Sequence, residues 1–345
     1  MNKPQNILIA RTDRIGDVIL TLPAAAVIKK HFPECRVSFL LREYTKDLAA
    51  NNPYIDEVIV LKENKGKPAF FSNYRLIKGK NFDTVLSVYP RIKLALIYLL
   101  AGIKTRAGSG YRWYSFLFNK KIYEHRKYGN KHELTHNVNL LKLIGIDETV
   151  TEESVEYGLS AGEDIKSKVK DALIKAGIDL SLPVIIFHPG SRGSAVDLPL
   201  VKMKELVKKT AALGNLNIIL TGDSREFDIC ATFPAEKNIF NLCGKFNLAE
   251  LIALAGFADI LVANSTGPIH IAAALGKYVI GFYPKIKAQS PARWAPYTEK
   301  KIIFVPPINC SNCTRKQCEE LNCMNNISID EVFMSIKEIL ERRIK

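Results

Sequence analysis

The first candidate for chemistry in this 345-residue chain is the polar loop 11–17, Arg-Thr-Asp-Arg-Ile-Gly-Asp. It follows an apolar run at 7–10 that predicts a buried strand, and a helix-like apolar segment comes after it. In an open α/β sheet the ligand site lies at the carboxyl ends of the strands, so this loop is placed to face a substrate. Asp17, the last residue of the loop, is therefore the first candidate for a functional side chain. A helix N-cap is its structural alternative.

The second half of the chain contains two more loops that could bind an anion. The run 184–187 leads into 188–194, His-Pro-Gly-Ser-Arg-Gly-Ser, and the run 260–263 leads into 264–270, Asn-Ser-Thr-Gly-Pro-Ile-His. Turns of small residues before a helix present backbone N–H groups and a helix N-terminus to an anion. Either turn alone usually marks only a tight turn, but two of them on neighbouring strands suggest a diphosphate. Glu226 could then accept hydrogen bonds from ribose hydroxyls, with a solvated helix-start residue as the alternative reading.

The elements that must position these loops follow a βαβ pattern in both halves of the chain. Continuous apolar runs are typical of strands buried on both faces, and hence of parallel sheets. We therefore expect an α/β fold with two Rossmann-like domains, 1–160 and 161–327, whose sheets face a central cleft. A C-terminal helix in 328–345 could pack back on the first domain, and Ser328 with Glu331 fits a capping box at its start. Besides the runs already given, the predicted strands are 37–41, 58–61, 84–88, 217–220, 239–242 and 278–282.

Composition favours a soluble two-domain protein, and its positive charge is compatible with an anionic partner. No apolar run approaches the roughly 18 residues that span a bilayer, and the N-terminus lacks the layout of a signal peptide, so we expect a cytoplasmic protein. The net charge is +14, and residues 62–131 hold sixteen Lys or Arg against three acidic residues. Such a region attracts nucleic acid, an anionic membrane surface or a phosphorylated substrate, although a solvated basic face is an equal alternative.

These motifs, taken in order, resemble glycosyltransferase family 9, which includes the bacterial heptosyltransferases of lipopolysaccharide core synthesis. The resemblance covers nearly the whole chain. It rests on the loop 11–17 with Leu22-Pro23 after it, on 188–191, on 265–276 (Ser-Thr-Gly-Pro-Ile-His-Ile-Ala-Ala-Ala-Leu-Gly) and on a cysteine-bearing tail. It implies the GT-B arrangement of two Rossmann-like domains and an inverting, metal-independent transfer from a nucleotide sugar, ADP-heptose in the first place. It also implies that Asp17 is the general base, with Asp13 as its rival on position alone.

The same resemblance implies a donor site in the second domain. Backbone N–H groups of Thr266 and Gly267 would hold the donor phosphates, and their dipoles would replace the metal that other glycosyltransferases use. The chain departs from the family pattern at Ser265, where Asp is common, and at Val196, where Lys is expected. Arg192 could supply the missing positive charge. The predicted donor-binding residues are Gly190, Ser191, Arg192, Glu226 near the ribose, Phe246 against the base, Ser265, Thr266, Gly267 and His270.

The first domain is expected to bind the acceptor, an anionic glycolipid at the inner face of the cytoplasmic membrane. Its predicted acceptor-binding residues are Arg11, Arg14, Arg91 and Lys93, with ordinary surface charge as the alternative. The segment 111–121 mixes aromatic and basic residues as an interfacial anchor does. Burial of those aromatic side chains in the domain core is the favoured reading, so contact with the membrane is a secondary expectation.

Cys310, Cys313, Cys318 and Cys323 have a spacing that would suit zinc or an iron–sulfur cluster. The family often carries such a tail while its chemistry needs no metal, so we expect a structural role and no required cofactor. Cys35, Cys230 and Cys243 read as small core residues.

Two other classes of protein are alternatives. A nucleic-acid-binding protein would use the basic half, but no recognisable nucleic-acid-binding motif is present. A dinucleotide-dependent oxidoreductase would need the Gly-x-Gly-x-x-Gly turn after the first strand, where the chain has only Gly16. We therefore expect a nucleotide sugar as the partner, and no nucleic acid.

Overall fold

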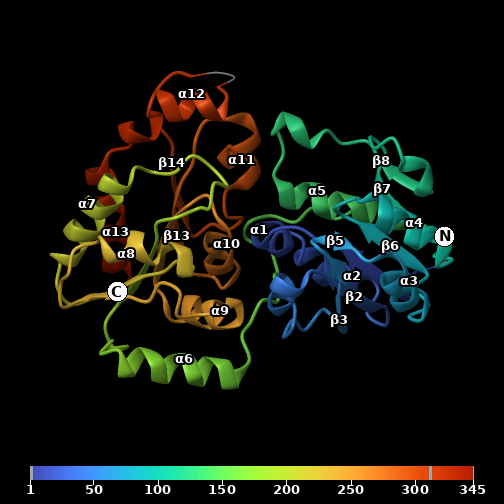
Figure 1. Cartoon of the computed structure of the whole chain (residues 1–345), viewed down its shortest axis with the longest axis horizontal. Coiled ribbons are helices and arrows are strands. Elements are labelled where there is room, and N and C mark those ends of the chain that lie inside the picture. The colour runs from blue at the N-terminus through green and yellow to red at the C-terminus, as the bar shows by residue number, and fades with distance from the viewer. Residues whose placement is uncertain (1–2, 311–312, 345) are drawn as a thin grey trace. The chain divides into compact units, whose positions relative to one another are not determined.

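The computed structural model describes residues 3–310 and 313–344, which form two compact units. Unit 1 comprises residues 1–126 and 133–159, and unit 2 comprises residues 127–132 and 160–345 (Figure 1). The short excursion of 127–132 into unit 2 was not predicted. Its His132 Nε2 lies 2.7 Å from the carbonyl oxygen of Ala295, and its ring packs on Tyr297.

Unit 1 is built from six parallel strands with helices between them and from the short antiparallel pair β4-β5, among the residues described. Its strands are β1 (Asn6–Ala10), β2 (Arg36–Leu41), β3 (Glu57–Val60), β4 (Glu63–Asn64), β5 (Lys67–Pro68), β6 (Thr84–Ser87), β7 (Thr105–Ser109) and β8 (Lys120–Ile122). Its helices are α1 (Ile15–Ile19), α2 (Pro23–His31), α3 (Phe70–Lys78), α4 (Ile92–Leu100) and α5 (Glu133–Asn139), with 3-10 turns η1 (Glu43–Leu48), η2 (Ser115–Leu117) and η4 (Leu140–Ile144). The turn η3 (Arg126–Tyr128) lies where the chain passes into unit 2.

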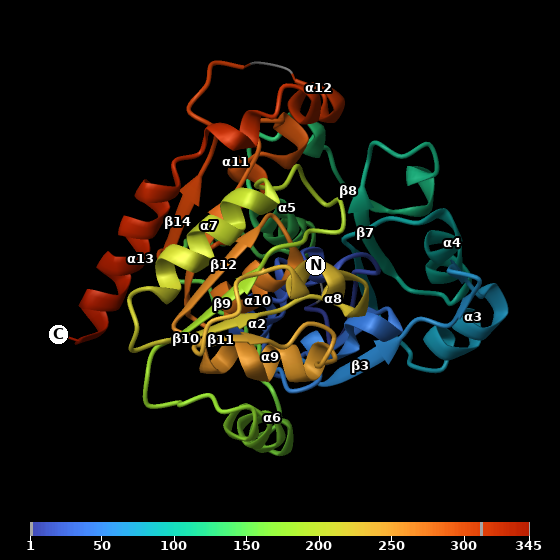
Figure 2. The same cartoon turned by 60° about the vertical axis from the view of Figure 1, so that its left-hand side comes forward.

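The main sheet of unit 1 has the order β3-β2-β1-β6-β7-β8, and all of its strand pairs are parallel. This is the Rossmann strand order, which reverses direction between β1 and β6. At that point Ala10 pairs with Ser87, so the loops after the two strands start side by side. The helices α3 and α4 lie together in Figures 1 and 2, and Ile77 and Leu94 from them pack into one core cluster with the sheet.

Unit 2 repeats the same design. Its strands are β9 (Val184–His188), β10 (Asn217–Leu220), β11 (Ile239–Asn241), β12 (Ile260–Asn264), β13 (Tyr278–Phe282) and β14 (Lys301–Phe304). Its helices are α6 (Glu163–Lys175), α7 (Leu200–Ala211), α8 (Phe227–Ala231), α9 (Leu248–Phe257), α10 (Gly267–Ala274), α11 (Pro291–Trp294), α12 (Arg315–Glu320) and α13 (Ile329–Ile344), with 3-10 turns η5 (Ser224–Glu226), η6 (Lys287–Gln289) and η7 (Cys323–Asn326).

The sheet of unit 2 has the order β11-β10-β9-β12-β13-β14, again all parallel, with its reversal between β9 and β12. His188 pairs with Ala263 there, so the two predicted anion-binding loops leave neighbouring strands at one sheet edge. The last helix, α13, lies beside α7, and its Val332 and Ile336 enter the core of unit 2 (Figure 2). The sequence left open a return of this helix to the first domain, whereas in the structure it packs on α7.

The predicted α/β fold with two parallel sheets is confirmed, although three strands of these sheets were missed, as were the two-residue strands β4 and β5. The predicted strands reappear within one or two residues as β1, β2, β3, β6 and β9–β13. Most of them are buried, whereas β3 and β11, at the sheet edges, are largely half-buried. The missed strands β7 and β8 lie next to and at a sheet edge and carry polar or half-buried residues, so they lack the continuous apolar run. The edge strand β14 does contain an apolar run, 302–304, which was not predicted to be a strand. Among the described residues, no helix is long and apolar enough to cross a membrane.

Candidate active site

The loop after β1 is organised by a buried arginine. Arg11 directly follows the strand, and only 2% of its surface is exposed. Its Nε donates to Asp13 Oδ1 at 2.8 Å, and its Nη2 donates to Asp17 Oδ1. Asp17 lies in the first turn of α1, whose N-cap is Arg14, so the alternative of Asp17 as N-cap is wrong. The guanidinium therefore fixes the orientation of the Asp17 carboxylate.

Helix α5 contributes the remaining hydrogen-bond partners of Arg11. Glu133 and Asn137 are one helical turn apart, and Arg11 Nη1 lies 3.3 Å from an oxygen of each. Asn137 Nδ2 also donates to Thr21 Oγ1 at 3.1 Å, and Thr21 Oγ1 donates to the carbonyl oxygen of Asp17 at 2.8 Å. Asp17 is thus held through both its side chain and its backbone.

Sequence reasoning missed Glu133, Asn137 and Arg126, which also pairs with Glu133. The available signal was the buried Arg11 itself, because a buried cation requires carboxylate partners. The sequence separation of 122 residues between Arg11 and Glu133 hides which carboxylate that is.

Several acidic and basic groups meet in this cluster. Three carboxylates, from Asp13, Asp17 and Glu133, face the guanidinium groups of Arg11 and Arg126. Burial raises the pKa of Asp13 to about 7, although Arg11 acts to lower it. Burial opposes the charge of Arg11, but the carboxylates of Asp17 and Asp13 outweigh it and raise its pKa. The cluster therefore keeps its arginine charged and makes the ionised form of Asp13 costly.

The predicted acceptor-binding residues differ in exposure. Arg11 is buried and its guanidinium is used within the cluster, whereas Arg14 at the N-cap of α1 is exposed. Arg91 lies beyond β6 at the N-cap of α4, with its guanidinium 6.0 Å from the ring centre of Tyr89. Lys93 is exposed on the first turn of α4. Arg14, Arg91 and Lys93 thus follow the two strands at the reversal point of the sheet.

In unit 2, Asn264 closes the loop that follows β9. This residue ends β12 and is fully buried. Its Nδ2 donates to the carbonyl oxygen of Pro189 at 2.6 Å, and its Oδ1 accepts from the backbone N–H of Leu198 at 2.8 Å. One side chain therefore ties both ends of the loop 189–198 to the neighbouring strand. Asn264 is the first residue of the predicted anion-binding loop 264–270, but its role in holding the loop 189–198 was not predicted.

A second residue that was not predicted, Arg315, holds the middle of the same loop. It lies at the start of α12, and its Nη1 donates to the carbonyl oxygen of Gly193 at 2.7 Å. Arg192 and Gly193 both have positive φ, +52° and +71°, so the loop turns sharply there. This turn exposes the side chain of Arg192, which pairs with Asp223 from the loop after β10.

Glu226 brings the loops after β9 and β10 together. Its Oε2 accepts from the backbone N–H of Asp223 at 2.8 Å in a capping box, so Glu226 is a helix-start residue, but it is buried and not solvated as that alternative expected. Its other oxygen lies against Gly190, where an added Cβ would be 1.7 Å from Oε1. Only glycine fits at that position with Glu226 as it stands. The predicted neighbours Gly190 and Glu226 are therefore in direct contact.

The third loop places the N-terminus of α10 at the same sheet edge. Thr266 is the N-cap and makes no side-chain capping bond, and Gly267 is the first helical residue. Just inside the helix, burial lowers the pKa of His270 to about 3, and its Nδ1 has no hydrogen-bond partner among the residues described. Ser265 lies before the cap and is half-buried. Phe246 is half-buried between β11 and α9, in the position from which it was predicted to line a base.

Each unit thus has polar loops at the reversal point of a Rossmann sheet, where such folds bind ligands. A family model for glycosyltransferase family 9 (heptosyltransferase) matches residues 71–324, more than half of the chain. The chain belongs to glycosyltransferase family 9. The predicted enzyme class is therefore confirmed, and the nucleic-acid-binding and oxidoreductase alternatives are set aside.

This glycosyltransferase is similar over nearly its whole length to a relative by sequence and to two solved structures. It is 25% identical over 356 residues to the lipopolysaccharide core heptosyltransferase OpsX of Haemophilus influenzae, an alignment that covers 97% of each chain. The solved structure of a family 9 glycosyltransferase from Veillonella parvula matches with a TM-score of 0.83 at 18% identity, covering 98% of this chain and 97% of that one. The E. coli ADP-heptose lps heptosyltransferase II matches with a TM-score of 0.79 at 19% identity, covering 99% and 100%. These structures share the pair of Rossmann-like domains of the GT-B class.

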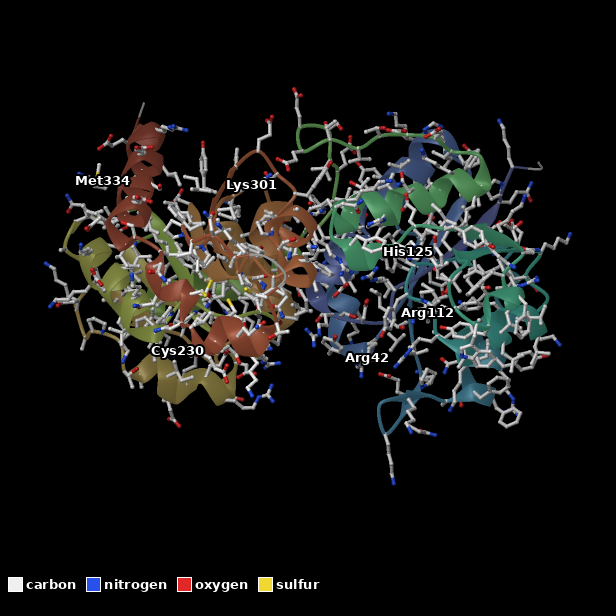
Figure 3. All side chains as sticks on the ribbon, turned by 90° about the horizontal axis from the view of Figure 1, so that it is seen from above. Arg42, Arg112, His125, Cys230, Lys301 and Met334 are labelled. Atoms are coloured by element: carbon white, nitrogen blue, oxygen red, sulfur yellow. A yellow bond between two sulfur atoms is a disulfide. The ribbon has the colours of Figure 1, made fainter. Side chains whose placement is uncertain are left out.

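The cysteines of the glycosyltransferase fall into two groups. Cys230 and Cys243 are buried as predicted, but they form a disulfide, which the sequence reading missed (Figure 3). Cys318 and Cys323 belong to the core of unit 2, and Cys313 packs against it. Within residues 3–310 and 313–344, no three His, Cys, Asp or Glu side chains are arranged to hold a metal ion. A structural role without a required metal stays the prediction for Cys310 and these three thiols. Analysis of zinc and iron in protein purified without chelators tests it.

Asp197 in the loop after β9 gives the glycosyltransferase a pH-dependent stability. Burial raises the pKa of this carboxyl to about 6, although Ser191 and Arg315 act to lower it. Between the unfolded value of 3.8 and about 6 the folded state binds the extra proton, so stability falls as pH rises through this window and is level above it. We expect Asp197→Asn to match the wild-type Tm at pH 4 and to exceed it by several degrees at pH 7. Thermal unfolding across this range checks it, and an offset that does not change with pH would contradict it.

Proposed function

We propose that this protein is an inverting, metal-independent heptosyltransferase that moves heptose from ADP-heptose onto a lipopolysaccharide core acceptor. Family membership supports sugar transfer. The similarity to the heptosyltransferases named above supports the donor and the acceptor. We also propose that the enzyme works in the cytoplasm, at the inner face of the membrane that carries the acceptor lipid. The observation that carries the proposal is the Asp17 carboxylate, held by a buried arginine on the loop after β1.

Asp17 is the general base in this proposal. As the acceptor hydroxyl attacks the anomeric carbon, its O–H bond breaks and the proton passes to Asp17. The bond between the anomeric carbon and the diphosphate breaks at the same time, and its electron pair leaves with ADP. Attack from the side opposite to the nucleotide inverts the configuration. Arg11 acts as a positioning residue, because its guanidinium orients Asp17 and is too deeply buried to bind the acceptor itself.

Unit 2 supplies the stabilisation of the leaving group. Backbone N–H groups at the N-terminus of α10, beginning at Gly267, are without helical partners and attract the negative charge that grows on the diphosphate. Arg192 adds a full positive charge from the loop after β9. Glu226, whose oxygen lies against Gly190, accepts hydrogen bonds from the ribose. The N–H groups of α10 and Arg192 stabilise the negative charge on the departing ADP. The proposed metal-independence of the reaction rests on this stabilisation and on the family resemblance.

The donor panel tests the proposal. ADP-heptose and other nucleotide sugars are incubated with enzyme and a phosphorylated lipopolysaccharide-core acceptor, and release of the nucleotide is measured with and without acceptor. We expect acceptor-dependent ADP release from ADP-heptose. Turnover with another donor alone would overturn the heptose assignment and fit the departures at Ser265 and Val196, leaving a family-related transferase. No acceptor-dependent release from any donor by folded protein would overturn the function.

Arg192 is expected to bind the donor diphosphate. Arg192→Ala should weaken ADP binding by about 10- to 100-fold, because a hydrogen bond to a charged group contributes roughly 1.5–3 kcal/mol. Arg225→Ala is the matched control, since Arg225 pairs with the same Asp223 carboxylate, at 2.9 Å, but belongs to the loop after β10. Calorimetric titration with ADP measures both variants. Equal affinities of the two variants would show that Arg192 does not contact the diphosphate.

A further inference from the structure

Helix α4 of unit 1 is apolar on both its inner and its outer side. Leu94, Ile97 and Tyr98 face the core and are buried. The spacing of Ile92, Leu96, Leu99 and Leu100 places them in one stripe along the helix, and all four are exposed. A surface helix normally presents polar side chains to water. An exposed apolar stripe of this kind therefore marks a surface that is covered in use.

The segment around η2 adds two aromatic rings beside this stripe. Trp113 is 76% exposed and Phe116 is 68% exposed, so the prediction that the aromatic residues of this segment are buried is wrong for these two, as it is for the exposed Tyr111. It is correct for Tyr114 and Phe118, which pack in one cluster with Ala95 of α4. Ala95 lies one turn before Leu99, so the segment that contacts it borders the exposed stripe. We call Ile92, Leu96, Leu99, Leu100, Trp113 and Phe116 together the α4 face.

The α4 face is bordered by unpaired positive charge. Lys93 on the helix itself, Lys104 after its end and Arg112 beside Trp113 are exposed, and none of them forms an ion pair with a described residue (Arg112 is labelled in Figure 3). The surrounding region 62–131 holds sixteen basic residues and three acidic ones. A second copy of this chain would bring like charges together around the apolar stripe, which opposes self-association.

We propose that the α4 face is the surface by which this protein seats on an anionic lipid bilayer. Trp and Phe side chains with flanking Lys and Arg are the composition of interfacial anchors, in which the rings reach the headgroup level and the cations pair with lipid phosphates. The inference rests on the proposed function and deepens it by naming the surface through which the protein reaches the membrane that presents the acceptor. Its test does not depend on turnover.

The chain has two Trp residues, so Trp294→Phe leaves Trp113 as the reporter of its own environment. This full-length variant is mixed with vesicles of phosphatidylglycerol and phosphatidylethanolamine, and with vesicles of phosphatidylcholine as the neutral probe. We expect sedimentation with the anionic vesicles only, a blue shift of Trp113 emission on binding, and weakening of both effects at high salt. Absence of a blue shift on bound protein would overturn the proposal, because Trp113 would then remain in water.

Matched variants separate the apolar and the charged contributions. Phe116→Ser with Leu99→Ser should lower vesicle partitioning at least 10-fold, whereas Val201→Ser on α7, also strongly exposed at 77%, should leave it unchanged. Lys93→Glu with Arg112→Glu should abolish the preference for anionic vesicles without touching the apolar contact. Equal partitioning of the Phe116 and Val201 variants would overturn the proposal, as would a dimer of the native protein that Phe116→Ser dissociates. If vesicles bind while the donor panel fails, only the proposed function falls.

Discussion

Asp17→Asn should lower turnover by about 100- to 10,000-fold, the range over which a positioned general base contributes to catalysis. The amide keeps the shape of the carboxylate and can still accept the hydrogen bond from Arg11 Nη2, so the loop after β1 should keep its conformation. What it cannot do is take the proton of the acceptor hydroxyl. We expect kcat to fall while ADP binding, which depends on unit 2, is unchanged. Initial rates of acceptor-dependent ADP release, with calorimetric titration by ADP, measure the two quantities.

Asp13→Asn is the control that separates the two candidate bases. Asp13 is on the same loop and also bonds Arg11, at 2.8 Å from Nε, so both variants disturb the cluster to a similar degree. Because burial raises the pKa of Asp13 to about 7, its removal should relieve the cost of ionising a buried carboxyl group and stabilise the fold above that pH. A large loss of kcat in Asp13→Asn with nearly normal rates in Asp17→Asn would reverse the assignment.

The elements predicted best from the sequence are those in which nearly every residue is apolar. The strands β1, β9 and β12 are short apolar runs that are almost completely buried, so composition alone marks them, and the loops after them follow. Strand β8, with its Lys-Lys-Ile sequence, is half-buried at the sheet edge, and nothing in those three residues distinguishes it from a loop. Composition also misled the prediction for the segment 111–121. Buried Tyr114 and exposed Trp113 are adjacent and both aromatic, so residue type does not show which of them is buried.

The candidate site was predictable where its residues share a loop and hidden where they meet from distant elements. Asp17, Gly190 and Arg192 stand in contiguous loops at strand ends, and topology places them at a binding edge. Glu133 and Arg315 reach those loops from 122 residues away in sequence, and a helix with a buried acid looks like any other amphipathic helix. Such partners follow from burial and hydrogen bonding, which only the fold defines.

The contact between Gly190 and Glu226 is expected to control donor binding. In Gly190→Ala the new Cβ would lie 1.7 Å from Glu226 Oε1, and the carboxylate is held from the other side by the backbone N–H of Asp223. It must therefore swing away and break that bond. We expect ADP affinity to fall by about 10- to 100-fold, since a lost hydrogen bond to a charged group costs about 1.5–3 kcal/mol. Gly256→Ala, in α9 with open space around its Cα, should bind ADP normally and gain a little stability from the better helix former.

A double-mutant cycle shows whether the loss passes through Glu226. Residues in contact are expected to be non-additive, whereas independent sites add. If the methyl group acts by displacing the carboxylate, Glu226→Ala alone should weaken ADP binding about as much as Gly190→Ala, and adding Gly190→Ala to it should cost nothing further. Full additivity would mean that the methyl group blocks the diphosphate directly at the loop after β9. The anion would then lie against Gly190 itself, and Glu226 would be left with its capping role on η5.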